Sequence, residues 1–186
     1  YKTIVDMPGH IFELGVYKGA SLVRLATYRD ALENDFSRKI VGFDAFGEFP
    51  TDKLKLSHDL DFIERFEGSG GHGLDKDEIA SVLTNKGFQN FELGKGKGWD
   101  TLPLYLEQHP ETRLSFVHLD MDVKEPTDFA LELLYDRVVP GGLIVFDDYN
   151  AVAGETISVD EFSRKYHLKI EKLPFYNVPS YIRKPV

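Results

Sequence analysis

The sequence predicts an α/β fold with a mainly parallel sheet and an antiparallel pair of strands at its end. Short apolar segments of strand length alternate along the chain with segments whose apolar residues recur at helical spacing. The last two strand-like segments, Leu168–Leu173 and Ser180–Arg183, have no helix between them and are separated by Pro174 and Pro179. Alternating strands and helices form parallel sheets, whereas consecutive strands without a crossover helix pair as a hairpin.

Strand-like and helical segments can be assigned from one end of the chain to the other. The expected strands are Ile11–Leu14, Lys39–Phe43, Asn90–Leu93, Leu114–Leu119, Leu143–Phe146, Leu168–Leu173 and Ser180–Arg183. The expected helices are Ala20–Leu32, Leu74–Lys86, Thr101–Gln108, Pro126–Arg137 and Ser158–Arg164. Residues 45–73 are loop-rich, with Pro50, several glycines and mixed charges. We expect one domain over residues 1–186, in which the segment 45–73 covers the active site.

Composition narrows the kinds of partner that the chain can have. Its formal net charge of -9 argues against binding to a nucleic-acid backbone, which requires clustered lysine and arginine. The absence of cysteine excludes disulfides, thiolate nucleophiles and cysteine-ligated zinc. The longest apolar stretches, such as Leu143–Phe146, are too short to span a membrane, and no signal peptide is visible. We expect a cytoplasmic enzyme that binds neither nucleic acid nor membrane; formation of a homo-oligomer stays open.

A glycine turn connects the first strand to the first helix. In an open α/β sheet, ligands bind beyond the carboxyl ends of the strands, and Gly15 and Gly19 lie in the first such turn. A dinucleotide site needs the pattern Gly-x-Gly-x-x-Gly, because a pyrophosphate must approach the backbone amides, but Val16 and Tyr17 stand where the middle glycine is required. The turn therefore disfavours an NAD-dependent dehydrogenase and suits S-adenosylmethionine, which has no phosphate.

Side chains near this turn match the functional groups of S-adenosylmethionine. Glu13 can accept a hydrogen bond from the ammonium group, and Tyr17, Ser21 or loop amides can donate to the carboxylate. Asp44, at the end of the second strand, is placed to bind the ribose hydroxyls. The pair Trp99-Asp100, after the third strand, could flank the adenine, although core packing explains Trp99 equally well. A purely structural turn is the alternative for the glycines.

Aspartates end two neighbouring strands at the same edge of the expected sheet. Asp120 ends the fourth strand, and Asp147 and Asp148 end the fifth. Adjacent carboxylates raise one another's pKa unless a cation neutralises them. Oxygen donors without cysteine suit Mg²⁺, Mn²⁺ or Ca²⁺ rather than zinc. These three residues are the candidate metal ligands, with Asp122 as a weaker fourth; helix capping or solvation at the edge of the sheet is the alternative.

A metal at this edge would assist methylation of an alcohol. A cation that chelates two neighbouring hydroxyls lowers the pKa of the acceptor, and a fixed geometry then favours attack on the methyl group of the sulfonium. A base is still required, and Asp120 and His118 are the candidates. His118 alternates with Asp120 along its strand, so both can face the same side, although a structural histidine is the commoner role.

Five segments, spread over nearly the whole chain, resemble one protein family. Glu13–Ser21 is similar to its cofactor loop, and Gly42–Pro50 to its second-strand signature, with a glycine and a glutamate interchanged. Gly96–Pro103 resembles its third-strand segment, and His118–Thr127 and Val139–Tyr149 resemble its two metal motifs. The family is that of the macrocin O-methyltransferases, which are bacterial enzymes that methylate deoxysugars of natural products.

The resemblance implies a Rossmann-like class I methyltransferase fold, with a mainly parallel seven-stranded sheet, an antiparallel edge strand and helices on both faces. It implies S-adenosylmethionine and Mg²⁺ or another divalent cation as cofactors, and a sugar or polyol hydroxyl as acceptor, on a natural product or a nucleotide-sugar. Asp120, Asp147 and Asp148 would bind the metal. The expected cofactor contacts are Glu13, Gly15, Val16, Tyr17, Gly19, Ser21, Asp44, Gly96, Trp99 and Asp100.

Two departures from the family concern the acceptor. Lys124 stands where the family usually has an aromatic residue, and the N-terminal helices that shape the family's acceptor pocket are not in this sequence. Two other functions stay open. A catechol-type methyltransferase would need a lysine base at the position of Val123, unless Lys124 swings in. A non-catalytic cofactor-binding module is disfavoured, because the glycine turn and all three aspartates are intact.

Overall fold

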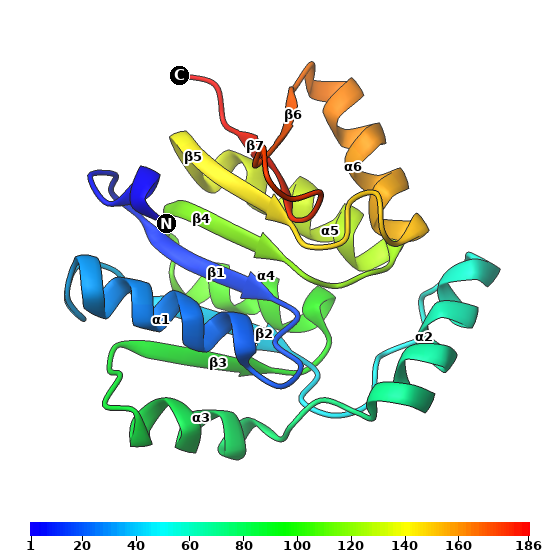
Figure 1. Ribbon diagram of the computed structural model, residues 1–186, viewed down its shortest axis with the longest axis horizontal. Helices are drawn as coiled ribbons and strands as arrows, with labels where there is room; N and C mark the ends of the chain where they lie inside the picture. The colour runs from blue at the N-terminus through cyan, green and yellow to red at the C-terminus, as the bar shows by residue number, and fades with distance from the viewer.

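The computed structural model describes residues 1–186 and contains a seven-stranded sheet in the order β3-β2-β1-β4-β5-β7-β6 (Figure 1). Strands β1 to β5 pair in parallel, whereas β7 pairs antiparallel with both β5 and β6. This confirms the predicted mainly parallel sheet with an antiparallel edge. The strands are β1 His10–Leu14, β2 Ile40–Asp44, β3 Phe91–Lys95, β4 Leu114–Leu119, β5 Val138–Phe146, β6 Ile170–Lys172 and β7 Ser180–Arg183.

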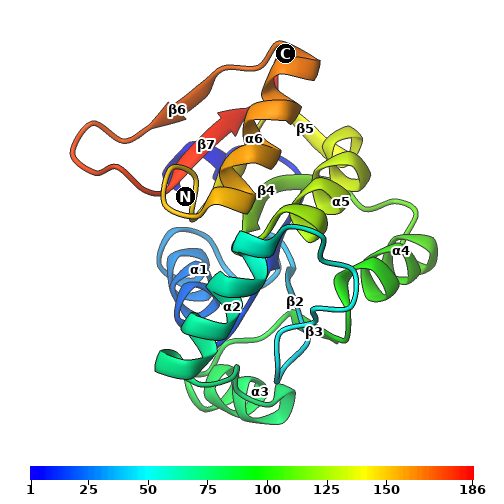
Figure 2. The same ribbon diagram turned by 90° about the vertical axis from the view of Figure 1, so that its right-hand side faces the viewer.

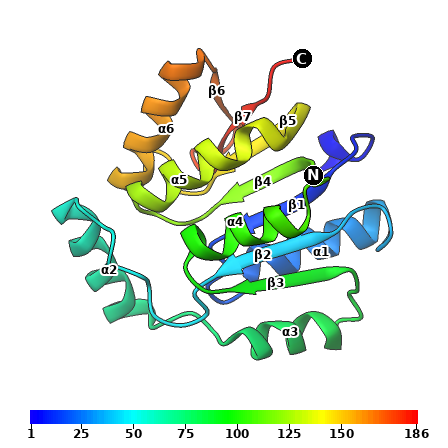
Figure 3. The same ribbon diagram turned by 180° about the vertical axis from the view of Figure 1, so that it is seen from behind.

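Helices cover both faces of the sheet (Figures 1 and 3). Helices α1 and α3 pack on one face, and α4, α5 and α6 pack on the other. None of the helices has both the length and the apolar composition that crossing a bilayer requires. The helices are α1 Ala20–Leu32, α2 Ser57–Gly70, α3 Lys76–Asn85, α4 Gly98–Gln108, α5 Lys124–Leu134 and α6 Ala153–Tyr166, with 3₁₀ turns η1 Lys2–Ile4 and η2 Tyr135–Arg137.

The central strands supply a core on each face of the sheet. Phe12 and Phe43 belong to the core under α4, α5 and α6, whereas Ile11 and Ile40 belong to the core under α1 and α3. Every residue of β4 is buried. Strands covered on both faces are apolar on both sides, which explains why the sequence shows continuous apolar segments.

One close backbone contact joins the ends of β1 and β4. Gly15 follows β1 with a φ of 89°, and a Cβ atom added there would lie 1.7 Å from the carbonyl oxygen of Asp120. Only glycine combines this left-handed backbone with such a close approach. The glycine turn is therefore in direct contact with the loop after β4.

The prediction of a loop-rich segment at 45–73 was wrong for Ser57–Gly70, which forms α2. Glycines at the end of this segment suggested a loop, but they lie at the C-terminal end of the helix, where Gly71 adopts a φ of 72°. Helix α2 contacts α6 and lies across the carboxyl ends of the strands (Figure 2). The fifth strand begins earlier than the predicted Leu143, because Pro140, Gly141 and Gly142 lie within β5.

Asp59 fixes the first turn of α2 to two other helices. Its side chain is fully buried and accepts a hydrogen bond from the backbone N–H of Lys124 at 2.9 Å, in the first turn of α5. A Cβ atom on Gly154, in the first turn of α6, would lie 2.5 Å from the carboxylate oxygens of Asp59. The amino ends of α5 and α6 favour a negative charge at Asp59, but burial outweighs them and raises its pKa.

Truncation of Phe12 tests the packing of the central strand. The Phe12 ring is fully buried, with its centroid 5.2 Å from that of Phe43 and 5.4 Å from that of Tyr105. We expect Phe12→Ala to lower the free energy of unfolding by about 3–5 kcal/mol in urea denaturation. Phe36→Ala, at a ring that is 91% exposed, serves as the control and should change it by less than about 0.5 kcal/mol. Equal losses in the two variants would contradict this packing.

Candidate active site

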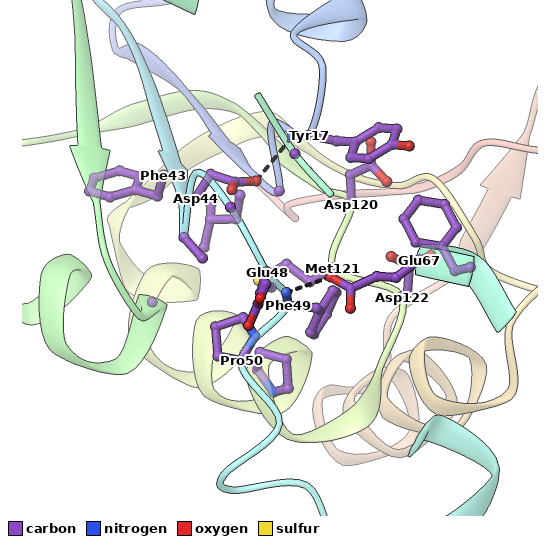
Figure 4. A pocket seen from close by; sticks show the side chains of 18 of the residues that line it. Tyr17, Phe43, Asp44, Glu48, Phe49, Pro50, Glu67, Asp120, Met121 and Asp122 are labelled. Carbon is purple, nitrogen blue, oxygen red and sulfur yellow. Dashed lines mark hydrogen bonds between the residues drawn. The ribbon is translucent and has the colours of Figure 1, made fainter. Parts of the chain in front are cut away.

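A cavity of about 310 Å³ lies at the carboxyl ends of the parallel strands (Figure 4). Its walls come from the turn after β1, the ends of β2 and β3, the loops after β4 and β5, and the segment 45–73. The segment 45–73 contributes aromatic and acidic side chains, among them Phe49, Phe66 and Glu67. Residues far apart in the sequence thus enclose one space at the edge where ligands bind in open α/β sheets.

The charged side chains that line this cavity are all acidic. No lysine, arginine or histidine is among the lining residues. Such a lining favours positively charged occupants and disfavours phosphate groups. The acidic lining residues are Asp44, Glu48, Glu67, Asp120, Asp122, Asp147 and Asp148.

Asp44 shapes the glycine turn. One of its carboxylate oxygens accepts hydrogen bonds from the backbone N–H groups of Val16 and Tyr17, at 2.7 and 3.0 Å. The other oxygen accepts from the N–H of Phe46 at 2.5 Å. Asp44 also lines the cavity, and the oxygen that accepts from Phe46 can accept one further hydrogen bond. The residue predicted to bind ribose hydroxyls is therefore at the cavity and holds the turn in place.

Tyr17 connects the glycine turn to the segment 45–73. Its hydroxyl donates to the carbonyl oxygen of Gly70 at 2.6 Å, and its ring packs on Phe66 with centroids 5.1 Å apart. At the other side of the cavity, Glu67 accepts from the N–H of Phe49 at 2.8 Å (Figure 4). Tyr17 lines the cavity, but its hydroxyl is engaged by the chain itself.

Five of the predicted cofactor contacts lie outside the cavity lining. Glu13 is fully buried and accepts a hydrogen bond from the hydroxyl of Ser21, so the two side chains contact each other. Val16 is buried in the core under α1 and α3. Its side chain packs so closely on Gly42 that a Cβ atom added to this glycine would lie 2.9 Å from the Val16 Cγ2 atom. Gly19 precedes α1 as its N-cap, and Asp100 is exposed on α4. Glu13, Val16, Gly19 and Ser21 therefore belong to the glycine turn and its surroundings without lining the cavity, whereas Asp100 is exposed to solvent.

Gly96 and Trp99 do line the cavity, at the end of β3 and the start of α4. Trp99 is not a core residue: the ammonium group of Lys53 lies 4.6 Å from its ring centroid. Next to it, the side chains of Lys97 and Asp52 form an ion pair at 2.9 Å. The segment 45–73 therefore contacts α4 through two neighbouring charged side chains.

Three aspartates bring their carboxylates together at the cavity. One oxygen each of Asp120, Asp122 and Asp148 lies within 4.8 Å of the other two. Asp122 has a φ of 62°, a left-handed conformation that aspartate tolerates better than most residues. The predicted ligand Asp147 also lines the cavity, but it lies outside this group of three. The structure thus groups the weaker candidate Asp122 with two of the predicted ligands.

His118 accounts for the different position of Asp147. Its Nε2 lies 3.2 Å from an Asp147 carboxylate oxygen, and its Nδ1 lies 3.6 Å from a Glu13 oxygen. Burial alone would lower the pKa of His118, but its hydrogen bond to Asp147 and the nearby carboxylate of Glu13 outweigh burial and raise the pKa to about 10. The same hydrogen bond lowers the pKa of Asp147. His118 is thus a cation beneath the cavity at neutral pH, and Asp147 is ionised.

The other carboxylates near the cavity are harder to ionise. Burial raises the pKa of Asp120 to about 7, with the charge of His118 opposing the shift and neighbouring carboxylates adding to it. Burial and the nearby acids also raise the pKa of Asp122 and Asp148. Glu155, in the first turn of α6, is fully buried beside them, and its pKa rises to about 8, mainly through burial. A cation at these carboxylates would relieve their repulsion.

Glu155 was not predicted as a site residue, because an acid in the first turn of a helix is a common capping feature. Glu48 and Glu67 line the cavity but were not predicted either, since the acids of the segment 45–73 follow no regular spacing in the sequence. The i, i+2 spacing of Asp120 and Asp122 was the one signal that could have placed Asp122 with the ligands.

Lys124 does not reach the cavity. Its ammonium group bonds to the carboxylates of Asp128 and Glu161, at 2.8 and 2.6 Å. Val123, the position that would carry the lysine base of a catechol-type enzyme, is fully buried. The cavity lining contains no lysine, so this geometry offers no lysine base.

Comparison with known proteins identifies the family. A family model described as macrocin-O-methyltransferase (TylF) matches residues 3–183. The chain belongs to this family. Membership confirms the resemblance noted from the sequence motifs.

Two proteins that modify sugars are similar to this chain. A Streptomyces olivaceus 8-demethyl-8-(2,3-dimethoxy-alpha-L-rhamnosyl)-tetracenomycin-C 4'-O-methyltransferase is 31% identical over 146 residues, which cover 77% of this chain. The match spans about half of that relative, 54% of its length. The apo structure of CalS11, a TDP-rhamnose 3'-O-methyltransferase of calicheamicin biosynthesis, is 28% identical with a TM-score of 0.71, over 98% of this chain and 74% of that one.

The fold is that of a class I methyltransferase. The O-methyltransferase NovP superposes with a TM-score of 0.85, over 100% of this chain and 76% of that one. Its sequence is 21% identical, so this likeness concerns the fold alone. The macrocin O-methyltransferase fold thus places the glycine turn and the aspartates at one edge of the sheet.

Neutralisation of Asp120 tests the repulsion among the carboxylates. The pKa of Asp120 in the folded chain, about 7, lies above its usual value, so the folded chain loses stability as pH rises from about 4 to 7. In EDTA, we expect Asp120→Asn to raise the free energy of unfolding at pH 8 by about 1–3 kcal/mol, and by less at pH 5.

Urea denaturation at the two pH values measures this difference. Asp30→Asn, at an exposed position on α1, is the control and should leave stability unchanged at both. If Asp120→Asn raised the free energy of unfolding as much at pH 5 as at pH 8, the prediction would be wrong.

Proposed function

We propose that the chain, as a single domain over residues 1–186, transfers a methyl group from S-adenosylmethionine to a sugar hydroxyl with help from a divalent cation. The observation that carries this proposal is the group of three carboxylates whose oxygens lie within 4.8 Å of one another, at a cavity that also contains the glycine turn. Membership of the macrocin O-methyltransferase family and the two sugar-modifying relatives support the choice of chemistry.

The cavity suits S-adenosylmethionine by shape and charge. Gly15, Asp44, Gly96 and Trp99 line its cofactor side, where glycines leave the backbone accessible and Trp99 offers an apolar face. Asp44 can accept from ribose hydroxyls. The sulfonium and ammonium groups are positive, in agreement with a lining whose charged residues are all acidic. The buried pair Glu13 and Ser21 then acts indirectly, by holding the turn.

The aspartates fit a hard divalent cation such as Mg²⁺. Carboxylate oxygens are its preferred protein ligands. The three oxygens lie within 4.8 Å of one another, so small movements of the side chains would bring them onto one cation. A bound cation would lower the pKa of the acceptor hydroxyl. Asp120 and Asp148 belong both to the ligand set predicted from the sequence and to the group of three carboxylates in the structure. We assign the third position to Asp147, because His118 keeps its carboxylate ionised.

Asp122 is then the proton acceptor of the site. It lines the cavity beside the other acids, where burial and its neighbours raise its pKa to about 9. A cation bound beside it would lower this pKa and leave the carboxylate ionised, so that it could take up the proton of the acceptor. His118 is protonated and buried below the lining, so it orients Asp147 and does not act as the base. This replaces Asp120 and His118, the two base candidates of the sequence analysis.

The acceptor is a deoxysugar attached to a natural product. Within the cavity, Phe49, Phe66 and Met121 supply apolar surface, which suits a sugar with few hydroxyls. The relatives act on a rhamnosyl tetracenomycin and on TDP-rhamnose. A neutral glycoside fits this lining better than a nucleotide-sugar, because no basic side chain of the lining can pair with a diphosphate. The segment 45–73 covers the acceptor as well as the cofactor.

Titration calorimetry and methyl transfer test the proposed function. We expect S-adenosylmethionine to bind with micromolar affinity, and a panel of rhamnosyl glycosides to be methylated with Mg²⁺ but not with EDTA. TDP-rhamnose and catechol serve as comparison acceptors and should react more slowly. Cofactor binding without turnover on any acceptor would point instead to a non-catalytic module, and no binding at all would refute the proposal.

Two asparagine variants separate the roles of Asp122 and Asp147. We expect Asp122→Asn to keep its affinity for Mg²⁺ and to lose about 10²–10⁴-fold in kcat, as loss of a general base does. Asp147→Asn should instead weaken Mg²⁺ binding in calorimetry. The reverse result would make Asp122 the third ligand and remove it as the proton acceptor.

A further inference from the structure

One buried side chain contacts both loops that carry the aspartates. Glu155 lies in the first turn of α6, and its Oε1 accepts a hydrogen bond from the backbone N–H of Asp148 at 2.9 Å. Its own backbone N–H donates to the carbonyl oxygen of Asp122 at 3.0 Å. Through these two bonds, Glu155 joins the loop after β4 to the loop after β5.

The sheet itself does not hold these loops together. The parallel pairing of β4 with β5 ends at Leu119 and Phe146, and one further backbone bond links Asp147 N–H to the carbonyl of Leu119 at 3.0 Å. Beyond that point the two loops lead into α5 and α6, which contact each other. The separation between Asp122 and Asp148 therefore depends on contacts outside the sheet, and Glu155 makes one with each of them.

Burying Glu155 at this place is costly. The side chain is fully buried next to other carboxylates, and its Oε2 has no hydrogen-bond partner. An unpartnered buried carboxylate oxygen lowers stability, and the amino end of α6 offsets only part of that loss. Despite this cost, Glu155 accepts the hydrogen bond from the backbone N–H of Asp148.

We propose that Glu155 is a positioning residue that sets the spacing of the two aspartate loops for the divalent cation. The proposal rests on the proposed function, since it assumes that the aspartates bind a cation. Groups that orient metal ligands typically change metal affinity by about 10–100-fold when they are removed. Glu155 is outside the group of carboxylates that approach within 4.8 Å. It acts instead through the backbone of Asp148 and Asp122, in the two loops that carry the proposed ligands.

Variants of Glu155 distinguish the hydrogen bond from the charge. Glu155→Met keeps the size of the side chain but has no strong acceptor, and Glu155→Ala removes it, so a folding failure of one variant leaves the other. Glu155→Gln keeps an oxygen that can accept from the Asp148 N–H. Thr156→Val is the control: it loses the bond from Asn150 N–H to the Thr156 hydroxyl, 2.9 Å long and in the same loop, and touches none of the aspartates.

Calorimetry with Mg²⁺ on the full chain gives the first readout. We expect Glu155→Met and Glu155→Ala to bind Mg²⁺ about 10–100-fold more weakly, and Glu155→Gln and Thr156→Val to bind it like the wild type. Hydrogen exchange of the Asp148 amide, measured without a cation, gives the second. It should become faster in Glu155→Met and stay slow in Glu155→Gln.

Each result decides between this proposal and the proposed function. Normal Mg²⁺ affinity in Glu155→Met would overturn the positioning role. A Glu155→Gln variant as weak as Glu155→Met would overturn it too, because the charge and not the hydrogen bond would then matter. If the wild type bound no Mg²⁺, the metal step of the proposed function would fail and this proposal with it, even if exchange at Asp148 behaved as expected.

Discussion

Repulsion among carboxylates at one edge of the sheet is the constraint on which the other features of the site depend. Asp120, Asp122 and Asp148 come within 4.8 Å of one another, and burial makes each of them harder to ionise. Without a cation this arrangement lowers stability. The fold sustains it because β4 and β5 are neighbours, so the loops after them begin at the same edge of the sheet, and because Glu155 bonds to both loops.

Opposing charges and dipoles around the acids make this arrangement tolerable. The protonated His118 lies between Glu13 and Asp147, and its charge opposes the raised pKa of Asp120. The amino ends of α5 and α6 lie beside Asp59 and Glu155 and favour their charge, although burial still raises the pKa of both. The same Asp59 fixes the first turn of α2, a helix that lies across the carboxyl ends of the strands (Figure 2) and supplies Phe66 and Glu67 to the cavity. The first turns of α5 and α6 therefore hold both the segment 45–73, through Asp59, and the aspartate loops, through Glu155.

Much of the sheet and the location of the site could be predicted from the sequence. Each strand carries its own apolar pattern, and the acids that follow two strands mark the edge where ligands bind. Helix α2 was not predicted because three glycines near its C-terminal end, Gly68, Gly70 and Gly71, made the segment resemble a loop. The side-chain partners were not predictable either. Glu13 bonds to Ser21, and Asp147 to His118, only because strand register and turn shape bring them together, and periodicity carries no information on either.

The acidic lining of the cavity bears on the design of inhibitors. Seven carboxylates and no basic side chain face a space of about 310 Å³. A bisubstrate compound that joins a permanently charged ammonium in place of the sulfonium to a neutral sugar mimic would match this potential. Phosphonate or sulfonate linkers, often chosen to add polarity, would meet carboxylates on every side. Selectivity over methyltransferases with basic acceptor pockets thus follows from the sign of the linker's charge.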